Sequence, residues 1–229
     1  MSAENISNFR KFGKKIICVG RNYKALAAEQ GNPIPESPIV FLKPTTSYIE
    51  PGQDIVIPPG CNEFFHEVEL GVVIGTRAKD VAENDVMKHV AGYALCLDMT
   101  AMDFQLAAKA DGQPWALAKG FDTACPVSEF IPKEKIPDTS AARLWLKVDG
   151  DMKQDSSTSD MIFPVPHVLS YLSRYFTLEP GDIVLTGSPA GAGPVSRDQV
   201  IDAGLEAGGQ ALTSFTFSIC LEQTMHTID

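Results

Sequence analysis

Two glutamates separated by one residue, Glu67 and Glu69, stand in a segment that is otherwise apolar between His66 and Ile74. If this segment is a strand, residues two apart lie on one face, so both carboxylates point the same way. Carboxylates side by side in apolar surroundings repel each other and lose hydration, which raises their pKa values unless a cation neutralises them. Hard oxygen ligands favour magnesium, calcium or manganese over zinc. The pair predicts a divalent-metal site, although two ordinary glutamates on an exposed strand edge give the same pattern.

A third carboxylate, Asp98, follows another apolar segment, Tyr93 to Leu97. The end of a strand is a common position for a functional residue. An aspartate here is also typical of the cap of a helix, and Thr100 with Asp103 has a spacing close to that of a capping box. Spacing alone does not decide between a metal ligand and a cap.

Short segments rich in β-branched residues recur along the chain and predict more strands than helices. The clearest alternation of apolar and polar residues lies near the C-terminus, and Asp149-Gly150 predicts a hairpin turn. Helices are predicted where a glycine follows the segment or a proline lies in its first turn. Because strands and helices do not alternate regularly, we predict an α+β fold dominated by mixed sheet. The predicted strands are 15–19, 39–42, 54–57, 67–74, 93–97, 143–148, 182–185 and 213–221, and the predicted helices are 22–30, 100–110 and 165–176.

The bulk properties favour one domain, residues 15–229, preceded by an N-terminal arm, residues 1–14. The 229 residues are 44% hydrophobic, with no repeat or Gly/Ser linker, which is enough for one substantial core. A formal net charge of −10 argues against a nucleic-acid partner, and no segment has the 18 apolar residues of a membrane span. Five scattered cysteines predict reduced thiols. Because the acidic Glu4 is unlike an Arg-rich transit peptide, we expect a cytoplasmic protein, with the mitochondrion as the alternative.

Six ordered motifs, running from about Lys15 to the last predicted strand, resemble those of the fumarylacetoacetate hydrolase superfamily. The chain is most similar to its small branch of acylpyruvases, oxaloacetate decarboxylases and oxaloacetate tautomerases. The motifs are Gly20-Arg21-Asn22-Tyr23, Phe41-Leu42-Lys43-Pro44, His66-Glu67-Val68-Glu69-Leu70-Gly71, Leu97-Asp98-Met99-Thr100-Ala101, Leu117-Ala118-Lys119 and Leu185-Thr186-Gly187-Ser188-Pro189.

The resemblance implies a β-roll of mixed strands with a few short helices, assembled as a homodimer. It also implies that Glu67, Glu69 and Asp98 bind one magnesium ion, with manganese as the alternative. His66, which alternates to the opposite face of the predicted strand, is expected to support the ligands from behind.

The same resemblance implies the residues that meet the substrate. Lys119 is expected to reach the substrate beside the metal, where a lysine orients a carboxylate or moves a proton. Arg21, Gln105 and Thr186 are expected to be polar contacts to a small 2-oxo acid. Each of these three residues has an ordinary structural interpretation when it is taken alone.

Two departures from the family bear on the reaction. The hydrolytic members carry a histidine and, three residues later, a glutamate; here Leu26 replaces the histidine and Glu29 remains, and Met102 replaces an arginine. Hydrolysis of an acylpyruvate needs a base to activate water. Decarboxylation and keto-enol exchange of oxaloacetate need mainly stabilisation of a metal-chelated enolate, with Glu29 or Lys119 as the proton carrier. The sequence therefore favours the last two reactions.

Two other functions are compatible with the sequence. One is a pseudoenzyme that keeps the metal pocket and binds a metabolite, which Leu26 and Met102 favour and the intact ligands and Lys119 oppose. The other is an isomerase or hydratase of longer dienoate diacids within the same superfamily.

Overall fold

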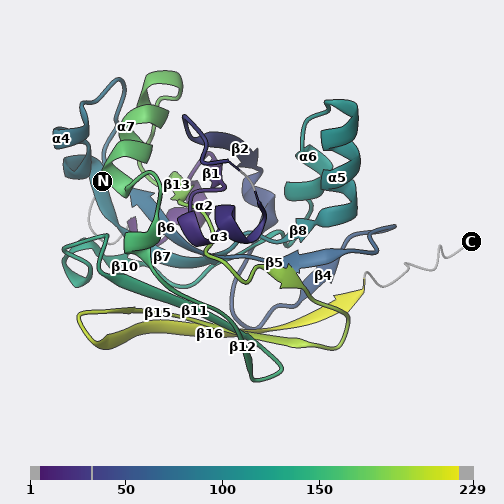
Figure 1. Cartoon of the computed structure of the whole chain (residues 1–229). Helices are drawn as coiled ribbons and strands as arrows, with labels where there is room; N and C mark the ends of the chain where they lie inside the picture. Colours follow the sequence, from purple (N-terminus) through teal and green to yellow (C-terminus); the bar gives the residue numbers. More distant parts are fainter. Residues whose placement is uncertain (1–5, 32, 222–229) are drawn as a thin grey trace, which may run out of the picture.

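Two sheets organise the residues that the computed structural model describes, 6–31 and 33–221 (Figure 1). The strands of the larger sheet are β1 (Ile16–Gly20), β2 (Ile39–Lys43), β6 (Val68–Ile74), β7 (Val90–Leu97), β10 (Ile131–Pro132) and β13 (Ile183–Leu185). Their order is β10-β7-β6-β13-β1-β2, parallel between β1 and β13 and antiparallel elsewhere. Every residue of β6 is buried, which explains why its sequence is nearly all apolar and makes its glutamate exceptional.

The second sheet is antiparallel except at one edge and has one buried face. It contains β4 (Ile55–Ile57), β11 (Ala142–Val148), β12 (Asp151–Ser157), β15 (Val200–Ala207) and β16 (Gln210–Leu221), in the order β12-β11-β15-β16-β4. In β16, Phe215, Phe217 and Ile219 are buried and the residues between them are exposed, which confirms the predicted alternation. Asp149 and Gly150 both have positive φ, as the predicted hairpin turn requires.

The main core lies between the two sheets. Val68, Leu70 and Val72 of β6 belong to the same apolar cluster as Leu144 and Phe217 of the second sheet. Because alternate residues of a strand face opposite sides, Glu69 and Gly71 point away from this core. The fold thus fixes which side of β6 is available for a polar site.

A small sheet and two helices cover that polar side at one end of the large sheet. The small sheet consists of β5 (Phe64–His66), β8 (Thr100–Ala101) and β14 (Gly193–Pro194). The helices α5 (Met102–Asp111) and α6 (Ala116–Lys119) pack beside each other and against β8 (Figure 1). Helix α5 ends at Gly112, whose φ of 67° is the left-handed conformation typical of a helix end.

Three of the other helices lie after the first strand. They are α3 (Lys24–Glu29), directly after β1, and α4 (Glu83–Val86) and α7 (Val165–Tyr175), which pack against each other. In Figure 1 the five-stranded sheet runs along the bottom of the view, and α4, α5, α6 and α7 lie at the top. None of the described helices is long and apolar enough to cross a bilayer.

The α+β class is confirmed, but some predicted boundaries are wrong for identifiable reasons. Thr100 and Ala101 form strand β8, so the helix predicted from residue 100 begins at Met102. Its N-cap residue, Ala101, makes no side-chain cap, and the predicted capping box of Thr100 and Asp103 is therefore wrong. Thr100 instead donates its hydroxyl to Glu67, which lies at the junction between β5 and β6.

Residues 6–14, the described part of the predicted N-terminal arm, pack on the rest of the described chain. It contains α2 (Phe9–Phe12), whose Phe9 is fully buried and makes an edge-on contact with Tyr48 at 6.2 Å between ring centroids. Arg10 forms an ion pair with Glu50 and donates a hydrogen bond to the carbonyl of Ser128.

Candidate functional site

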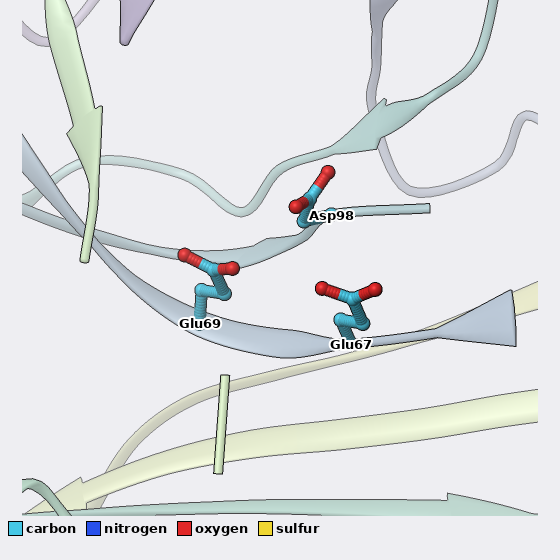
Figure 2. A group of neighbouring side chains, drawn as sticks. All are labelled: Glu67, Glu69 and Asp98. Carbon is cyan, nitrogen blue, oxygen red and sulfur yellow. The ribbon is translucent and has the colours of Figure 1, made fainter. Parts of the chain in front are cut away.

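Three carboxylates converge at the end of the large sheet. Oxygen atoms of Glu67, Glu69 and Asp98 lie within 4.8 Å of one another, and Figure 2 shows the three side chains turned toward a common point. The antiparallel pairing of β6 with β7 sets Val68 opposite Leu97, and the Asp98 backbone donates to the Glu67 carbonyl at 2.9 Å. Strand alternation brings the two glutamates to one face, and strand pairing adds the aspartate.

Burial places these carboxylates in conflict with one another. The pKa of Glu69 is raised well above its usual range, first by burial and then by the charges of Asp98 and Glu67. The pKa of Glu67 is also raised, chiefly by burial, although Lys119 opposes the shift. The backbone N–H of Gly187 donates to Glu69 at 2.7 Å and offsets part of its lost hydration.

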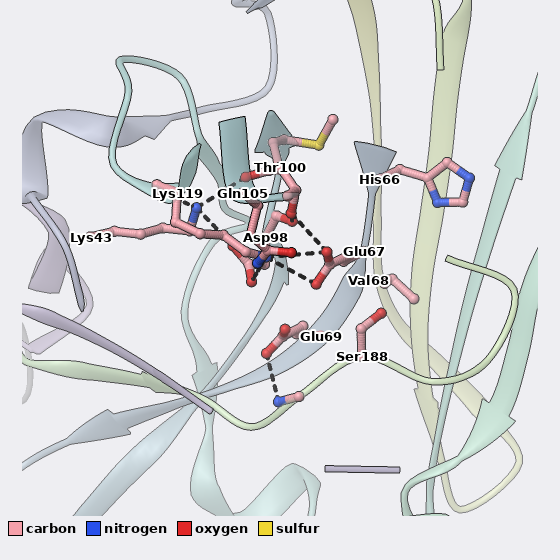
Figure 3. A network of polar contacts seen from close by, with 12 residues as sticks. Lys43, His66, Glu67, Val68, Glu69, Asp98, Thr100, Gln105, Lys119 and Ser188 are labelled. Carbon is pink, nitrogen blue, oxygen red and sulfur yellow. Dashed lines mark hydrogen bonds and ion pairs between the residues drawn. The ribbon is translucent and has the colours of Figure 1, made fainter. Parts of the chain in front are cut away.

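Two buried lysines hold the aspartate in its charged form (Figure 3). Lys119 Nζ lies 2.6 Å from Asp98 Oδ2 and 3.1 Å from Glu67 Oε1, and Lys43 Nζ lies 2.7 Å from Asp98 Oδ1. Burial opposes ionisation of Asp98, but the two ammonium charges outweigh it and lower its pKa. Burial also opposes the charged form of Lys119 and by itself lowers its pKa. The charges of Asp98 and Glu67 outweigh this effect and raise the pKa of Lys119 above the usual lysine range, so it stays protonated.

The donor set fits a hard divalent cation. Three carboxylates against two ammonium groups leave one negative charge uncompensated in a buried cluster. Among the described residues Asp98 Oδ1 has the ion pair with Lys43 and no assigned hydrogen bond. A cation bound to these oxygens would satisfy that atom and remove the repulsion that raises the pKa values of the glutamates.

One of the three carboxylates, Glu67, lines a cleft of about 340 Å³, at the lower end of the range for small-molecule sites, while Glu69 and Asp98 are buried and absent from its lining. Two of the predicted substrate contacts, Arg21 and Gln105, line this cleft together with Glu67 and Lys119. Arg21 has a φ of 55°, a left-handed conformation that a non-glycine residue adopts only rarely. The remaining lining residues are Gly20, Leu26, Gln30, Phe41, Phe65, Met102, Leu106, Lys109, Trp115 and Ala192.

Two other predicted site residues lie outside the lining of the cleft. Thr186 is fully buried, and its hydroxyl donates to the carbonyl of Leu70 at 2.8 Å, so the structure ties this side chain to the neighbouring strand. Glu29 is exposed on the last turn of α3 and accepts a hydrogen bond from the Gly191 N–H at 3.0 Å, next to the lining residue Ala192. Glu29 therefore lies at the rim.

The two departures from the family pattern both face the cleft. Leu26 is only 7% exposed and lines it, and Met102, the first residue of α5, lines it as well. The wall is apolar at both positions, where the hydrolytic members are expected to carry a histidine and the branch is expected to carry an arginine.

His66 lies on the opposite side of its strand from the carboxylates, as predicted (Figure 3). Its Nδ1 lies 3.1 Å from Oε1 of the buried Gln154, and the same oxygen accepts the backbone N–H of Val68. Burial lowers the pKa of His66 to about 4, so the ring is neutral and Nδ1 is the donor. Gln154 also donates to the Ser188 hydroxyl, which connects β6 to the loop whose Gly187 N–H donates to Glu69.

Sequence reasoning assigned no role in the site to Lys43, Lys109 and Gly187, and it placed Thr100 only in a helix cap. Lys43 stands at the end of an apolar strand inside a quoted motif, a signal that could have indicated a buried cation. Lys109 had no such signal, because only the packing of α5 places it in the cleft.

Comparison with known proteins assigns the chain to a family of enzymes. The family model for the fumarylacetoacetate (FAA) hydrolase C-terminal domain matches residues 15–215, and the chain belongs to this family. The resemblance inferred from the six motifs is thereby confirmed.

Individual relatives cover nearly the whole chain. Mouse (Mus musculus) "oxaloacetate tautomerase FAHD1, mitochondrial" is 49% identical over 90% of this chain and 93% of its own length. Dictyostelium discoideum "oxaloacetate decarboxylase, mitochondrial" is 50% identical over 87% of this chain and 92% of its own. The structure of fumarylpyruvate hydrolase from Pseudomonas aeruginosa, in complex with Mn²⁺ and pyruvate, superposes with a TM-score of 0.85 at 34% identity, covering 91% of this chain and 90% of that one.

Proposed function

We propose that this protein is a metal-dependent enzyme that interconverts the keto and enol forms of oxaloacetate, with decarboxylation of the same substrate as its second activity. The observation that carries the proposal is the convergence of Glu67, Glu69 and Asp98 at the edge of a small cleft that also holds Lys119. The relatives named for oxaloacetate chemistry support an active enzyme over a pseudoenzyme or a dienoate isomerase.

The three carboxylates are the proposed ligands of magnesium, with manganese as the alternative. A divalent ion bound there supplies Lewis-acid polarisation of the 2-oxo group and so lowers the free energy of the enolate. The hydrogen bonds from Gly187 to Glu69 and from Thr100 to Glu67 hold the carboxylates in place before the cation binds.

Orientation of the substrate and transfer of its proton are assigned to two different residues. Keto-enol exchange breaks a C3–H bond and forms an O–H bond at C2, so one group must hold the proton between these positions. Because its ion pairs keep Lys119 protonated, we assign it to orienting the substrate carboxylate. Glu29 at the rim is the proposed proton carrier. The apolar side chain of Leu26 leaves the adjacent wall without a base for water, which disfavours hydrolysis.

Three rates measured on the magnesium-loaded protein test the proposal. They are the decay of enol absorbance in fresh oxaloacetate, the release of pyruvate from oxaloacetate, and the cleavage of acetylpyruvate. We expect enol decay to be accelerated most and acetylpyruvate cleavage least, with Asp98→Asn reducing all three to background. Asp151→Asn, which makes the same substitution at an exposed position of β12, is the matched control. Enol decay no faster with the wild-type protein than with Asp98→Asn would refute the proposal.

We also propose a homodimer, by resemblance to the family, and a cytoplasmic location with the mitochondrion as the alternative. The names of the mouse and Dictyostelium relatives support the mitochondrial alternative. Sedimentation analysis of the purified protein tests the assembly, and fractionation of cells that express the full-length tagged protein tests the location.

A further inference from the structure

One face of α5 forms a wall of the cleft. Met102, Gln105, Leu106 and Lys109 all line it. Their spacing of three, four and seven residues places them on one face over two helical turns. Lys109 is thus on the same face as Met102, the position where the family pattern expects an arginine.

The ammonium group of Lys109 extends back along the helix toward Met102. Side chains of an α-helix lean toward its N-terminus, and Lys109 Nζ donates a hydrogen bond to Gln105 Oε1, one turn earlier, at 2.7 Å. The same nitrogen lies 5.2 Å from the centroid of the Trp115 ring, which also lines the cleft. Lys109 therefore presents its charge to the cleft at the level of Gln105.

A second cation lines the cleft from another part of the chain. Arg21 lines the cleft from the end of β1 in its left-handed conformation. Within residues 6–31 and 33–221, neither Arg21 nor Lys109 forms an ion pair with a carboxylate, whereas Lys43 and Lys119 are both paired with Asp98. The pKa of Lys109 is lowered by burial and then by the positive charges of Arg21 and Lys119.

Two like charges that share a partly buried cleft and make no ion pair there repel each other, and an anion bound between them relieves this repulsion. Arg21 and Lys109 line the same cleft as Glu67, one of the proposed metal ligands, so one small molecule can contact both ends. A cleft of about 340 Å³ suits a short diacid better than a long one.

We propose that Arg21 and Lys109 form a subsite for the second carboxylate of a short dicarboxylic 2-oxo acid, with Lys109 supplying the cation that Met102 lacks. The subsite makes the protein select dicarboxylic over monocarboxylic 2-oxo acids. The inference rests on the proposed function only for the assignment of the substrate's other end to Glu67, Glu69 and Asp98.

Binding of two unreactive probes to the magnesium-loaded protein tests the subsite. Malate and lactate share a 2-hydroxy acid group, and malate alone carries a second carboxylate. By calorimetry, we expect Lys109→Met to weaken malate binding about tenfold or more, as for the loss of a hydrogen bond to a charged group, and to change lactate binding less than about twofold. Lys109→Arg is expected to restore most of the affinity for malate.

Lys147→Met is the matched control, because Lys147 also lies over a tryptophan, Trp145, at 5.6 Å from its ring centroid, but on the surface strand β11. It is expected to leave both affinities unchanged. Equal weakening of malate and lactate by Lys109→Met, or no change in either, would overturn the proposal. The binding assay does not depend on turnover. If the wild-type protein shows no catalysis but Lys109→Met selectively loses affinity for malate, the proposed function is rejected and the subsite is kept. If catalysis is normal but Lys109→Met leaves the ratio of malate to lactate affinity unchanged, the subsite is rejected and the proposed function is kept.

Discussion

Lys43 and Asp98 form an ion pair inside the protein, with Nζ 2.7 Å from Oδ1 and neither side chain more than 1% exposed. Lys43 also donates to the backbone carbonyls of Met99 and Lys119. One lysine at the end of β2 thereby fixes both the third carboxylate of the cluster and the backbone of the lysine beside it. Lys43 contributes to the site from behind, because it is absent from the lining of the cleft.

Replacement of Lys43 by methionine should destabilise the metal-free protein by up to about 3 to 5 kcal/mol, since it removes one of the two ammonium groups that pair with the buried Asp98 and leaves only Lys119. The double variant Lys43→Met/Asp98→Asn removes both charges and should recover most of this loss. Urea denaturation in the presence of a chelator measures the free energy of unfolding. A double variant as unstable as Lys43→Met alone would contradict this account of the ion pair.

Replacement of Glu69 by glutamine should separate metal binding from stability. Glu69 has a raised pKa and is repelled by Asp98 and Glu67, so the neutral isostere should leave the metal-free protein at least as stable as the wild type. We expect the affinity for magnesium to fall more than about tenfold, because loss of a residue that only hydrogen-bonds to a metal ligand already costs about this much. Calorimetric titration with magnesium, paired with thermal unfolding with and without the metal, measures both effects. Unchanged affinity would remove Glu69 from the proposed ligands.

Replacement of Lys119 by methionine should abolish turnover without weakening the metal site. Its ammonium contacts Asp98 and Glu67 and therefore competes with a cation for the same oxygens. We expect magnesium affinity to stay the same or rise, while the rate of enol decay at saturating oxaloacetate falls by about 10² or more. Turnover close to that of the wild type, or a large loss of magnesium affinity, would show that the role given to Lys119 is wrong.

Replacement of Gly187 by alanine should weaken the metal site through the backbone. The φ of Gly187 is 105°, an added Cβ would lie 2.7 Å from Cβ of Asn22, and its N–H supports Glu69. Gly52 has a similar φ of 98° with open space around it, so Gly52→Ala isolates the conformational cost of about 1 to 2 kcal/mol. We expect only Gly187→Ala to lower magnesium affinity and to exceed that cost in urea denaturation. Equal effects of the two variants would show that neither the contact with Asn22 nor the support of Glu69 matters.

Replacement of Leu26 by histidine should favour hydrolysis selectively. Leu26 lines the cleft and Glu29 follows one turn later, so a histidine there has a carboxylate as its neighbour. We expect acetylpyruvate cleavage to rise by up to about 10² to 10⁴, the range of general-base catalysis, with a smaller change in enol decay. If a cation at position 102 is also required, the gain should appear in Leu26→His/Met102→Arg.

Leu26→Gln is the matched control, because it introduces a polar group of similar size without a base. A buried polar group that lacks a partner costs about 1 to 3 kcal/mol, so both variants should lower the thermal midpoint. Only the histidine variants should gain hydrolysis. Lower stability with no hydrolytic gain in the single or the double variant would show that this helix is not a water-activating wall.

The sequence by itself determined the local relationships and the family. The period of two in a strand placed Glu67 and Glu69 on one face, and it predicted the buried face of β16 from Phe215 and Phe217. The ordered motifs identified the family because short residue patterns survive where the rest of the chain varies. The same patterns indicated that Leu26 departs from the hydrolytic members and that Met102 departs from the branch.

Only the tertiary structure decided which of these faces meet. Thr100 has the sequence of a helix cap, yet the pairing of β8 with β5 turns its hydroxyl to Glu67, and Thr186, predicted at the substrate, donates to a neighbouring strand. Lys43 and Lys109 have the same side chain, but β2 ends beside a buried aspartate whereas α5 turns Lys109 toward a cleft in which it makes no ion pair with a described residue. Periodicity fixes which residues share a face of one element, but contacts between elements distant in sequence depend on strand pairing and packing, which no local spacing encodes.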